Sequence, residues 1–103
     1  MVGSAAKRRI NRIITKYGES FLINDTTSAK GFFQMMTTGQ INSLYPDTVS
    51  YYVNHPAYRL IATIDTQLTV GDGIKRDNTT MYIRKLLPVR LSTTQVYQIA
   101  YID

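Results

Sequence analysis

A change of hydrophobic period after Gly18 is the feature that most constrains the fold. Beyond it, apolar residues recur at every second position in short runs, which is the period of a β-strand. The segment LTVGDGIKRDNTTMYIRK, residues 68–85, shows the pattern most densely, with corners at residues 71–73 and 77–78. Gly, Asp and Asn tolerate the positive φ of tight turns. Corners this close together favour short antiparallel strands over long helices.

Six or seven short strands are therefore expected after the N-terminal region. The runs that predict them are SFLIN (20–24), GFFQMMT (31–37), VSYYV (49–53), AYRLIATID (57–65), residues 74–76, TMYIRKL (80–86) and QVYQIAYID (95–103). Alternation places Leu60 and Ala62, Met81 and Ile83, and Val96, Gln98, Ala100 and Ile102 on one face of their strands. Residues 25–28 are predicted to form a turn and residues 37–47 a loop. Pro88, which lacks an amide donor, predicts a strand end or a sheet edge.

The N-terminal residues follow a different period. Ala6, Ile10, Ile13, Ile14 and Tyr17 are spaced as one stripe of an α-helix, which we predict over residues 4–18. Ser4 is the expected N-cap, and Gly18 is expected to end the helix in left-handed geometry. We therefore expect a mainly β (α+β) fold: a small antiparallel β-barrel or sandwich, residues 19–103, with one N-terminal helix.

The charge is concentrated in that helix. The chain has a formal net charge of +5. Residues 1–18 contain five cations and no acid, whereas residues 19–103 contain equal numbers of basic and acidic residues. The cations of the helix are Lys7, Arg8, Arg9, Arg12 and Lys16. They are candidates for contact with DNA or an acidic partner, and the alternative is a solvated face that keeps a neutral body soluble.

Length and composition set the broad class. A chain of 103 residues is expected to form one domain, residues 1–103, that buries roughly two-thirds of its unfolded surface. It has no cysteine, no apolar run of the roughly 20 residues that a membrane span needs, and no expected secretory signal. We therefore expect no membrane association and no disulfide.

Catalytic residue types are sparse. His55 is the only histidine and lies beside Pro56 in an expected loop, where a surface role is favoured over that of a general base. The aspartates fall mostly in turns, where they have ordinary turn-forming roles. No cluster of His and Cys exists to bind zinc, and the glycines at 71 and 73 do not precede a helix as a phosphate loop requires. We expect no enzyme activity, no catalytic or metal site and no cofactor.

Aromatic residues suggest binding surfaces instead. Eight tyrosines in 103 residues is a high share, and tyrosine is favoured at protein interfaces, although strand propensity alone also explains it. The run GFFQMM is apolar on both faces of its strand, which one small barrel cannot bury without a cover. The candidate interface residues are Phe32, Phe33, Met35, Tyr51, Tyr52, Tyr97 and Tyr101.

Three segments resemble the small head-completion, or head-tail connector, proteins of long-tailed phages and phage-derived particles. The first is a helix that ends in Tyr-Gly and runs into a strand, ITKYGESFLIND. The second is the strand AKGFFQMM, and the third is LTVGDGIKRDNTTMYIRKLLPV, a Gly-Asp corner, a hairpin and a Tyr-apolar run. Residues 38–57 carry little of the resemblance.

The resemblance implies a small β-barrel with a helix and a long mobile loop, although aromatic residues in 38–57 leave open which loop faces a channel. It also implies a stopper-like, sixfold ring that stacks below the portal and adaptor and helps close the DNA channel. Its partners would be portal, adaptor and tail proteins and further copies of itself, near DNA. The location implied is a virion or phage-like particle assembled in the host bacterial cytoplasm.

Two other functions stay open. One is a tail-terminator or other minor tail structural protein, which belongs to the same class. The other is a small nucleic-acid-binding β-barrel, which the cationic helix favours. The tyrosines argue against an oligonucleotide-binding surface, because they are not interleaved with Lys and Arg.

Overall fold

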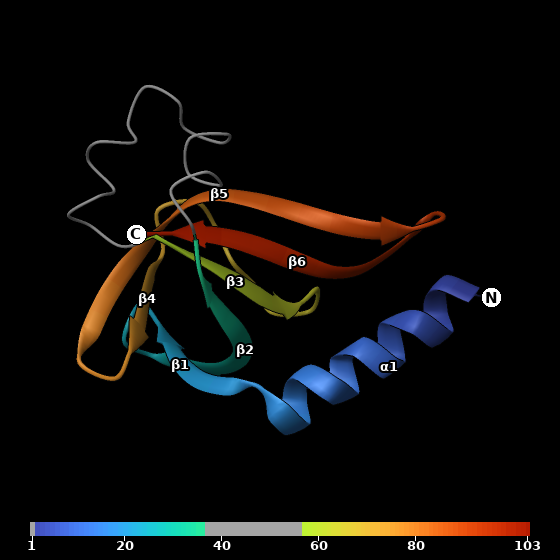
Figure 1. Ribbon diagram of the computed structural model, residues 1–103, viewed down its shortest axis with the longest axis horizontal. Helices are drawn as coiled ribbons and strands as arrows, with labels where there is room; N and C mark the ends of the chain where they lie inside the picture. Colours follow the sequence, from blue (N-terminus) through green and yellow to red (C-terminus); the bar gives the residue numbers. More distant parts are fainter. Residues whose placement is uncertain (1, 37–56) are drawn as a thin grey trace.

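The computed structural model describes residues 2–36 and 57–103 of the chain, and within them one helix precedes six strands (Figure 1). The elements are α1 (Val2–Tyr17), β1 (Glu19–Ile23), β2 (Thr27–Met35), β3 (Tyr58–Thr63), β4 (Gly73–Arg76), β5 (Thr79–Leu91) and β6 (Thr94–Ile102). The strands pair antiparallel and close in the order β1-β2-β3-β6-β5-β4. The predicted mainly β fold is confirmed, and the sheet is a closed barrel. The predicted strand 49–53 and the loop 37–47 lie outside the described residues.

The turns are where the sequence indicated them, with small displacements. Between β1 and β2, Asn24 and Asp25 have φ angles of 52° and 61°, so the turn begins one residue earlier than expected and β2 already starts at Thr27. At the β3–β4 corner only Gly71 has a positive φ, 97°. Gly73 instead belongs to β4, so the prediction that both glycines form the corner is wrong.

Strand β5 extends through Pro88 to Leu91, so the prediction that this proline ends the strand is wrong. The alternative prediction, a sheet edge, is consistent with the pairing. Strand β4 pairs only with the first residues of β5, Thr79 to Tyr82, whereas β6 accompanies β5 to its end. A proline is tolerated there because one side of β5 needs no ladder partner. The β5–β6 hairpin therefore projects beyond the barrel (Figure 1).

The barrel interior follows the predicted alternation. Its core contains Phe21, Ile23, Leu60, Ile74, Met81, Ile83, Ala100 and Ile102. Val96 and Gln98 are also buried on the same face of β6. Phe33 packs against this core and meets Phe21 edge to face, with ring centroids 5.6 Å apart. Apolar burial of this kind is the main stabilising contribution to a domain of this size.

The helix covers part of the predicted stripe, with Ala6 and Ile10 half-buried. Ile14 is buried, but Ile13 is 43% exposed and Tyr17 is 66% exposed. The side turned to the barrel instead passes through Gly3, where an added Cβ would lie 2.5 Å from the Thr94 Cβ. Since the backbone at Gly3 touches the hairpin, the buried stripe rotates away from Ile13 and Tyr17.

Both ends of the helix also differ in detail from the prediction. Ser4 lies inside the helix and is not its N-cap, because α1 already includes Val2. Gly18 follows the last helical residue, as expected, but its φ is not positive. A Cβ there would lie 2.4 Å from the Ile14 carbonyl oxygen and 3.0 Å from the Gly31 nitrogen. Close backbone approach, not left-handed geometry, therefore requires this glycine.

Candidate interaction surfaces

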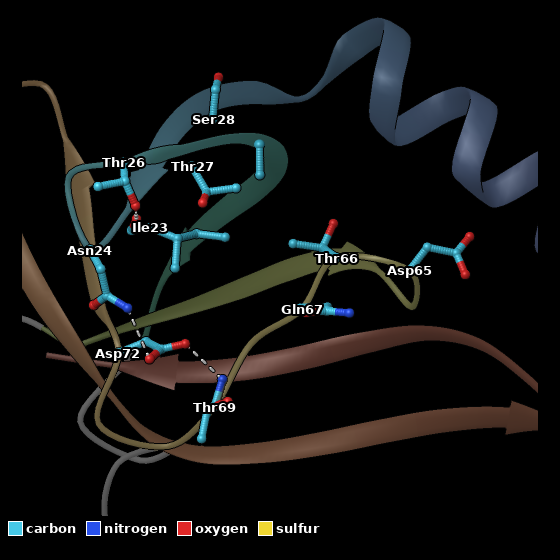
Figure 2. Close-up of a pocket in the computed structure, with 11 residues that line it drawn as sticks. Ile23, Asn24, Thr26, Thr27, Ser28, Asp65, Thr66, Gln67, Thr69 and Asp72 are labelled. Carbon is cyan, nitrogen blue, oxygen red and sulfur yellow. Dashed lines mark hydrogen bonds between the residues drawn. The ribbon is translucent and has the colours of Figure 1, made fainter.

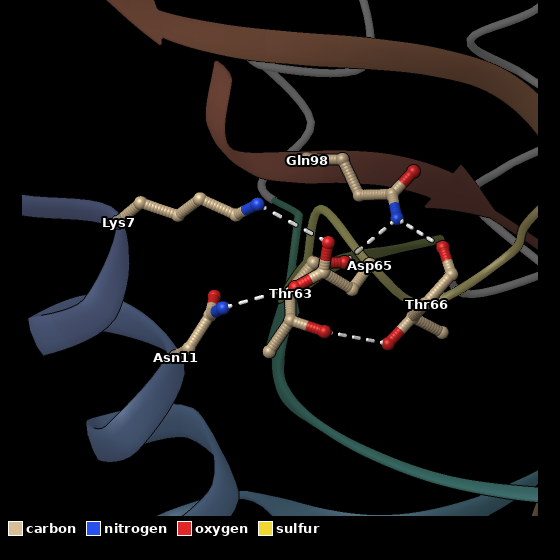
Figure 3. Close-up of polar contacts among 6 residues, drawn as sticks. All are labelled: Lys7, Asn11, Thr63, Asp65, Thr66 and Gln98. Atoms are coloured by element: carbon tan, nitrogen blue, oxygen red, sulfur yellow. Dashed lines mark hydrogen bonds and ion pairs between the residues drawn. The ribbon is translucent and has the colours of Figure 1, made fainter. Parts of the chain in front are cut away.

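A polar junction fixes the helix on the barrel (Figure 3). Asp65, in the loop after β3, pairs with Lys7 at 3.2 Å and accepts a hydrogen bond of 3.2 Å from the Asn11 Nδ2. On β6, the buried Gln98 donates hydrogen bonds from Nε2 to the backbone carbonyls of Thr63 and Thr66, at 2.8 and 2.6 Å. Lys7, one of the predicted partner-contact residues, is thus engaged within the chain.

The other four predicted cations share the solvent side of α1. Arg8, Arg9, Arg12 and Lys16 are all exposed, and the helix contains no acid. Of these four cations, Lys16 has a defined contact within the described part of the chain: its ammonium lies 5.3 Å from the Tyr17 ring centroid. We call these four residues the cationic helix face. Ile13 and Tyr17 are exposed on the same helix.

The sheet carries a second surface, which faces away from the barrel interior. Residues paired across β2, β3, β6 and β5 form one cross-strand row, with Phe32 opposite Ile61, Ile61 opposite Ile99, and Ile99 opposite Leu87. Their neighbours in sequence, Leu60, Ala62 and Ala100, are buried in the barrel. Because side chains alternate along a strand, the row points outward. We call Phe32, Ile61, Ile99 and Leu87 the outer row.

The predicted interface residues occupy several environments. Phe32 is in the outer row, and Tyr97 lies next to it, half-buried and paired with Val89. Met35 is 59% exposed at the end of β2, whereas Tyr101 is buried against Met36 and Ala57. Phe33 points into the barrel and packs on its core. Tyr51 and Tyr52, like His55, lie outside the described residues.

Ile61, Ile99 and Leu87 were not predicted as interface residues. The signal for two of them was in the sequence, because Ile61 and Ile99 lie on the otherwise polar faces of AYRLIATID and QVYQIAYID. Their alignment in one row depends on the strand order β2-β3-β6-β5 and its register. Sequence alternation alone does not give either of these.

A polar hollow of about 590 Å³ lies between the β1–β2 turn and the β3–β4 loop (Figure 2). Hydroxyl and amide side chains line it together with Asp65 and Asp72. Asp72 accepts hydrogen bonds from Asn24 Nδ2 at 3.1 Å and from the Thr69 backbone nitrogen at 2.9 Å. Asp65 serves the helix junction. The two carboxylates therefore have structural partners within the chain.

Arg76 joins neighbouring strands on the barrel surface. Its guanidinium pairs with Glu19 of β1, and its carbon Cζ lies 4.7 Å from the Phe33 ring centroid and 5.5 Å from that of Tyr58. The hydrogen bond to Glu19 is the largest cause that raises the pKa of Arg76 above its usual value. A planar guanidinium suits this combination of stacking and pairing. The Arg76 side chain thus links β4 to residues of β1, β2 and β3.

The described ranges 2–36 and 57–103 contain no group of three or more His, Cys, Asp or Glu that could hold a metal ion. In the same part of the chain, no helix has the length and apolarity needed to cross a membrane. Comparisons with protein-family models, curated proteins and solved structures give no significant match to the chain.

Proposed function

We propose that the chain is a structural subunit of a phage neck: a head-completion or head-tail connector protein. It forms a ring that joins portal and adaptor to tail and helps close the DNA channel. The proposal is supported by where the three resembling segments lie in the fold. The first spans the end of α1, Gly18 and β1; the second is the body of β2; the third spans the β3–β4 corner and the β4–β5 hairpin. Together they build the β2-β1-β4-β5 side of the barrel.

The surfaces suit a protein that works by contact. A ring subunit needs two different interfaces for its neighbours, and a subunit in a stack needs more. The described part of the chain offers a cationic helix face, an outer row and a projecting β5–β6 hairpin. Positive charge on α1 is compatible with a location beside DNA, whose phosphates attract cations without sequence preference. The particle would be assembled in the bacterial cytoplasm.

Reconstitution tests this proposal. The purified chain is mixed with portal–adaptor rings and, separately, with tail tubes from the phage or phage-like element that encodes it. Native mass spectrometry and electron microscopy then report the complexes. We expect a ring of the chain on the adaptor side of the portal. Binding only to the end of the tail tube would favour a tail terminator, and binding to neither would contradict a role in the neck or tail. A monomer in isolation does not count against the proposal, since such rings can form on docking.

A second candidate, binding of nucleic acid, is favoured by one specific observation: the cationic helix face carries four exposed cations on a helix without acids. In that case the logarithm of the affinity falls linearly with the logarithm of salt concentration, by about 0.9 per phosphate neutralised. Reversing Arg8, Arg9 and Arg12 to Glu should abolish binding. The matched control reverses Lys30, Lys75 and Arg90 on the barrel. No binding of DNA or RNA at low salt would exclude this function, and equal losses from both triple variants would show that the cationic helix face is not its site.

A further inference from the structure

The outer row is continuous and apolar across four strands (β2, β3, β6 and β5). With neighbouring strands about 4.8 Å apart, three spacings give a row roughly 14 Å long. Leu87 is 43% exposed, and the other three side chains are half-buried. Val89 and Tyr97, a paired set on the same face, widen the row toward the hairpin. Contiguous apolar surface of this kind marks an interaction site more often than scattered single residues do.

The chain's own helix covers the opposite face of the hairpin. Gly3 lies against Thr94, which shares its side of β6 with Val96 and Gln98, the side that turns inward. The outer row is on the other side. At one end of it, Met36 and Ala57 cover Tyr101 and pack on Ile99. The stretch from Phe32 to Leu87 stays partly exposed.

Cations surround the outer row, and Asp103, the acid that directly follows β6, is buried in an ion pair with Arg84. On the outward side, Arg59 and Lys85 flank the outer row at its Tyr101 edge, where both are paired with Tyr101. Arg90 lies at the opposite edge, next to Val89. Lys30 is exposed two residues before Phe32. The sequences of β2, β3, β5 and β6 contain no Asp or Glu. A partner that fits this surface must therefore bring carboxylates to its rim, because like charges brought together across an interface are unfavourable.

A second copy of the chain does not supply them. A symmetric contact would place the same cations face to face. Apart from Asp77, and Asp47 outside the described residues, each acidic residue is already held within the chain by an ion pair or hydrogen bond. These are Glu19, Asp25, Asp65, Asp72 and Asp103. Nucleic acid would satisfy the cations but would leave the aliphatic row uncovered.

We propose that the outer row is a docking surface for a different protein, whose contact surface has an apolar centre and an acidic rim. This inference goes beyond the proposed function and does not rest on it, because it depends only on the strand register and the charges of this chain. Affinity in such an interface resides in the apolar centre, while the rim charges govern the choice of partner and the association rate.

A display selection tests the inference without phage components. The probe is a library on a rigid helical scaffold whose flat face is randomised among Leu, Tyr, Ser, Asp and Lys. Selected binders should combine Leu or Tyr at the centre with Asp at the rim. Leu87→Asp should weaken them by about tenfold or more. Val70→Asp is the matched control: Val70 is 58% exposed but lies outside the four strands, so binding should be retained.

A second variant tests whether the cations beside the outer row select an acidic partner. Lys85→Glu with Arg90→Glu changes exposed residues only, and selection against it should favour Lys over Asp at the rim. Binders that ignore both Leu87→Asp and the double reversal would overturn the inference. So would self-association of the unmodified chain that Leu87→Asp abolishes, which would identify a second copy as the occupant. Competition by DNA that Leu87→Asp does not change would assign the cations to nucleic acid instead.

Discussion

At the scale of single residues, neighbouring positions on β5 differ sharply in what they contribute. Ile83 is 1% exposed in the core, whereas Tyr82 is 47% exposed on the outside of the same strand. Ile83→Ala removes buried methyl groups and leaves a cavity, so it should reduce the free energy of unfolding by roughly 2–5 kcal/mol. Tyr82→Ala should cost clearly less. Urea denaturation followed by circular dichroism measures both, and equal losses would show that the inward face of β5 is assigned wrongly.

Two glycines in strands make a second comparison of this kind. At Gly31 an added Cβ would lie 2.6 Å from the Leu60 Cδ1 and 2.7 Å from the Ile61 carbonyl oxygen. At Gly73 its nearest neighbour would be 3.4 Å away, an ordinary contact. Gly31→Ala should therefore destabilise the fold by about 1–3 kcal/mol, because a backbone oxygen in a sheet cannot easily move.

Gly73→Ala is the control for Gly31→Ala. It should be nearly neutral, since alanine loses less conformational freedom than glycine in a strand. Thermal unfolding of the two variants under the same conditions measures this difference in stability. A variant Gly31→Ala that is as stable as Gly73→Ala would contradict the close approach of β2 and β3 at this point.

At the scale of elements, Asp65 is a polar link between α1 and the barrel, since it contacts both Lys7 and Asn11. An exposed ion pair of this type contributes at most about 1 kcal/mol to global stability. Asp65→Asn should therefore change unfolding little but should release the N-terminal half of the helix. We expect faster amide hydrogen exchange in α1 with no change in β3 and β6.

Asp25→Asn is the matched control for that experiment, because Asp25 pairs with Lys75 at 3.9 Å on the barrel and not with the helix. In the Asp25→Asn variant, the amide hydrogens of α1 should exchange at the same rate as in the unmodified chain. If Asp65→Asn leaves exchange in α1 unchanged as well, the junction does not hold the helix, and the packing of Ile14 and the close approach of Gly3 to Thr94 would have to account for its position.

Sequence patterns predicted the elements better than their contacts. Alternation placed Leu60, Ile83 and Ala100 inside because one face of each strand is buried. The isoleucines of the helix were expected to face either the protein's own core or a partner; Ile14 is buried in the core, whereas Ile13 is exposed. Spacing along a helix identifies an apolar stripe, but the surface it meets decides which edge of the stripe is covered.

At the scale of the whole molecule, charge is distributed unevenly. Four helix cations are exposed on α1, and further cations surround the outer row, while most acids are used inside the chain. The helix charge was visible in the sequence. The outer row was not visible there, because it depends on the pairing of β6 with β3, and these two strands are distant in the sequence. Both surfaces are suited to assembly, and neither brings groups together for catalysis.

The most direct test of a structural role in a phage neck is a reconstruction by electron cryomicroscopy of the particle that encodes this chain, with mass spectrometry of its purified proteins. We expect the chain among the particle proteins and a ring of six-stranded barrels between portal–adaptor and tail. A particle that lacks the chain, or a neck whose rings leave no density for this barrel, would contradict the proposal.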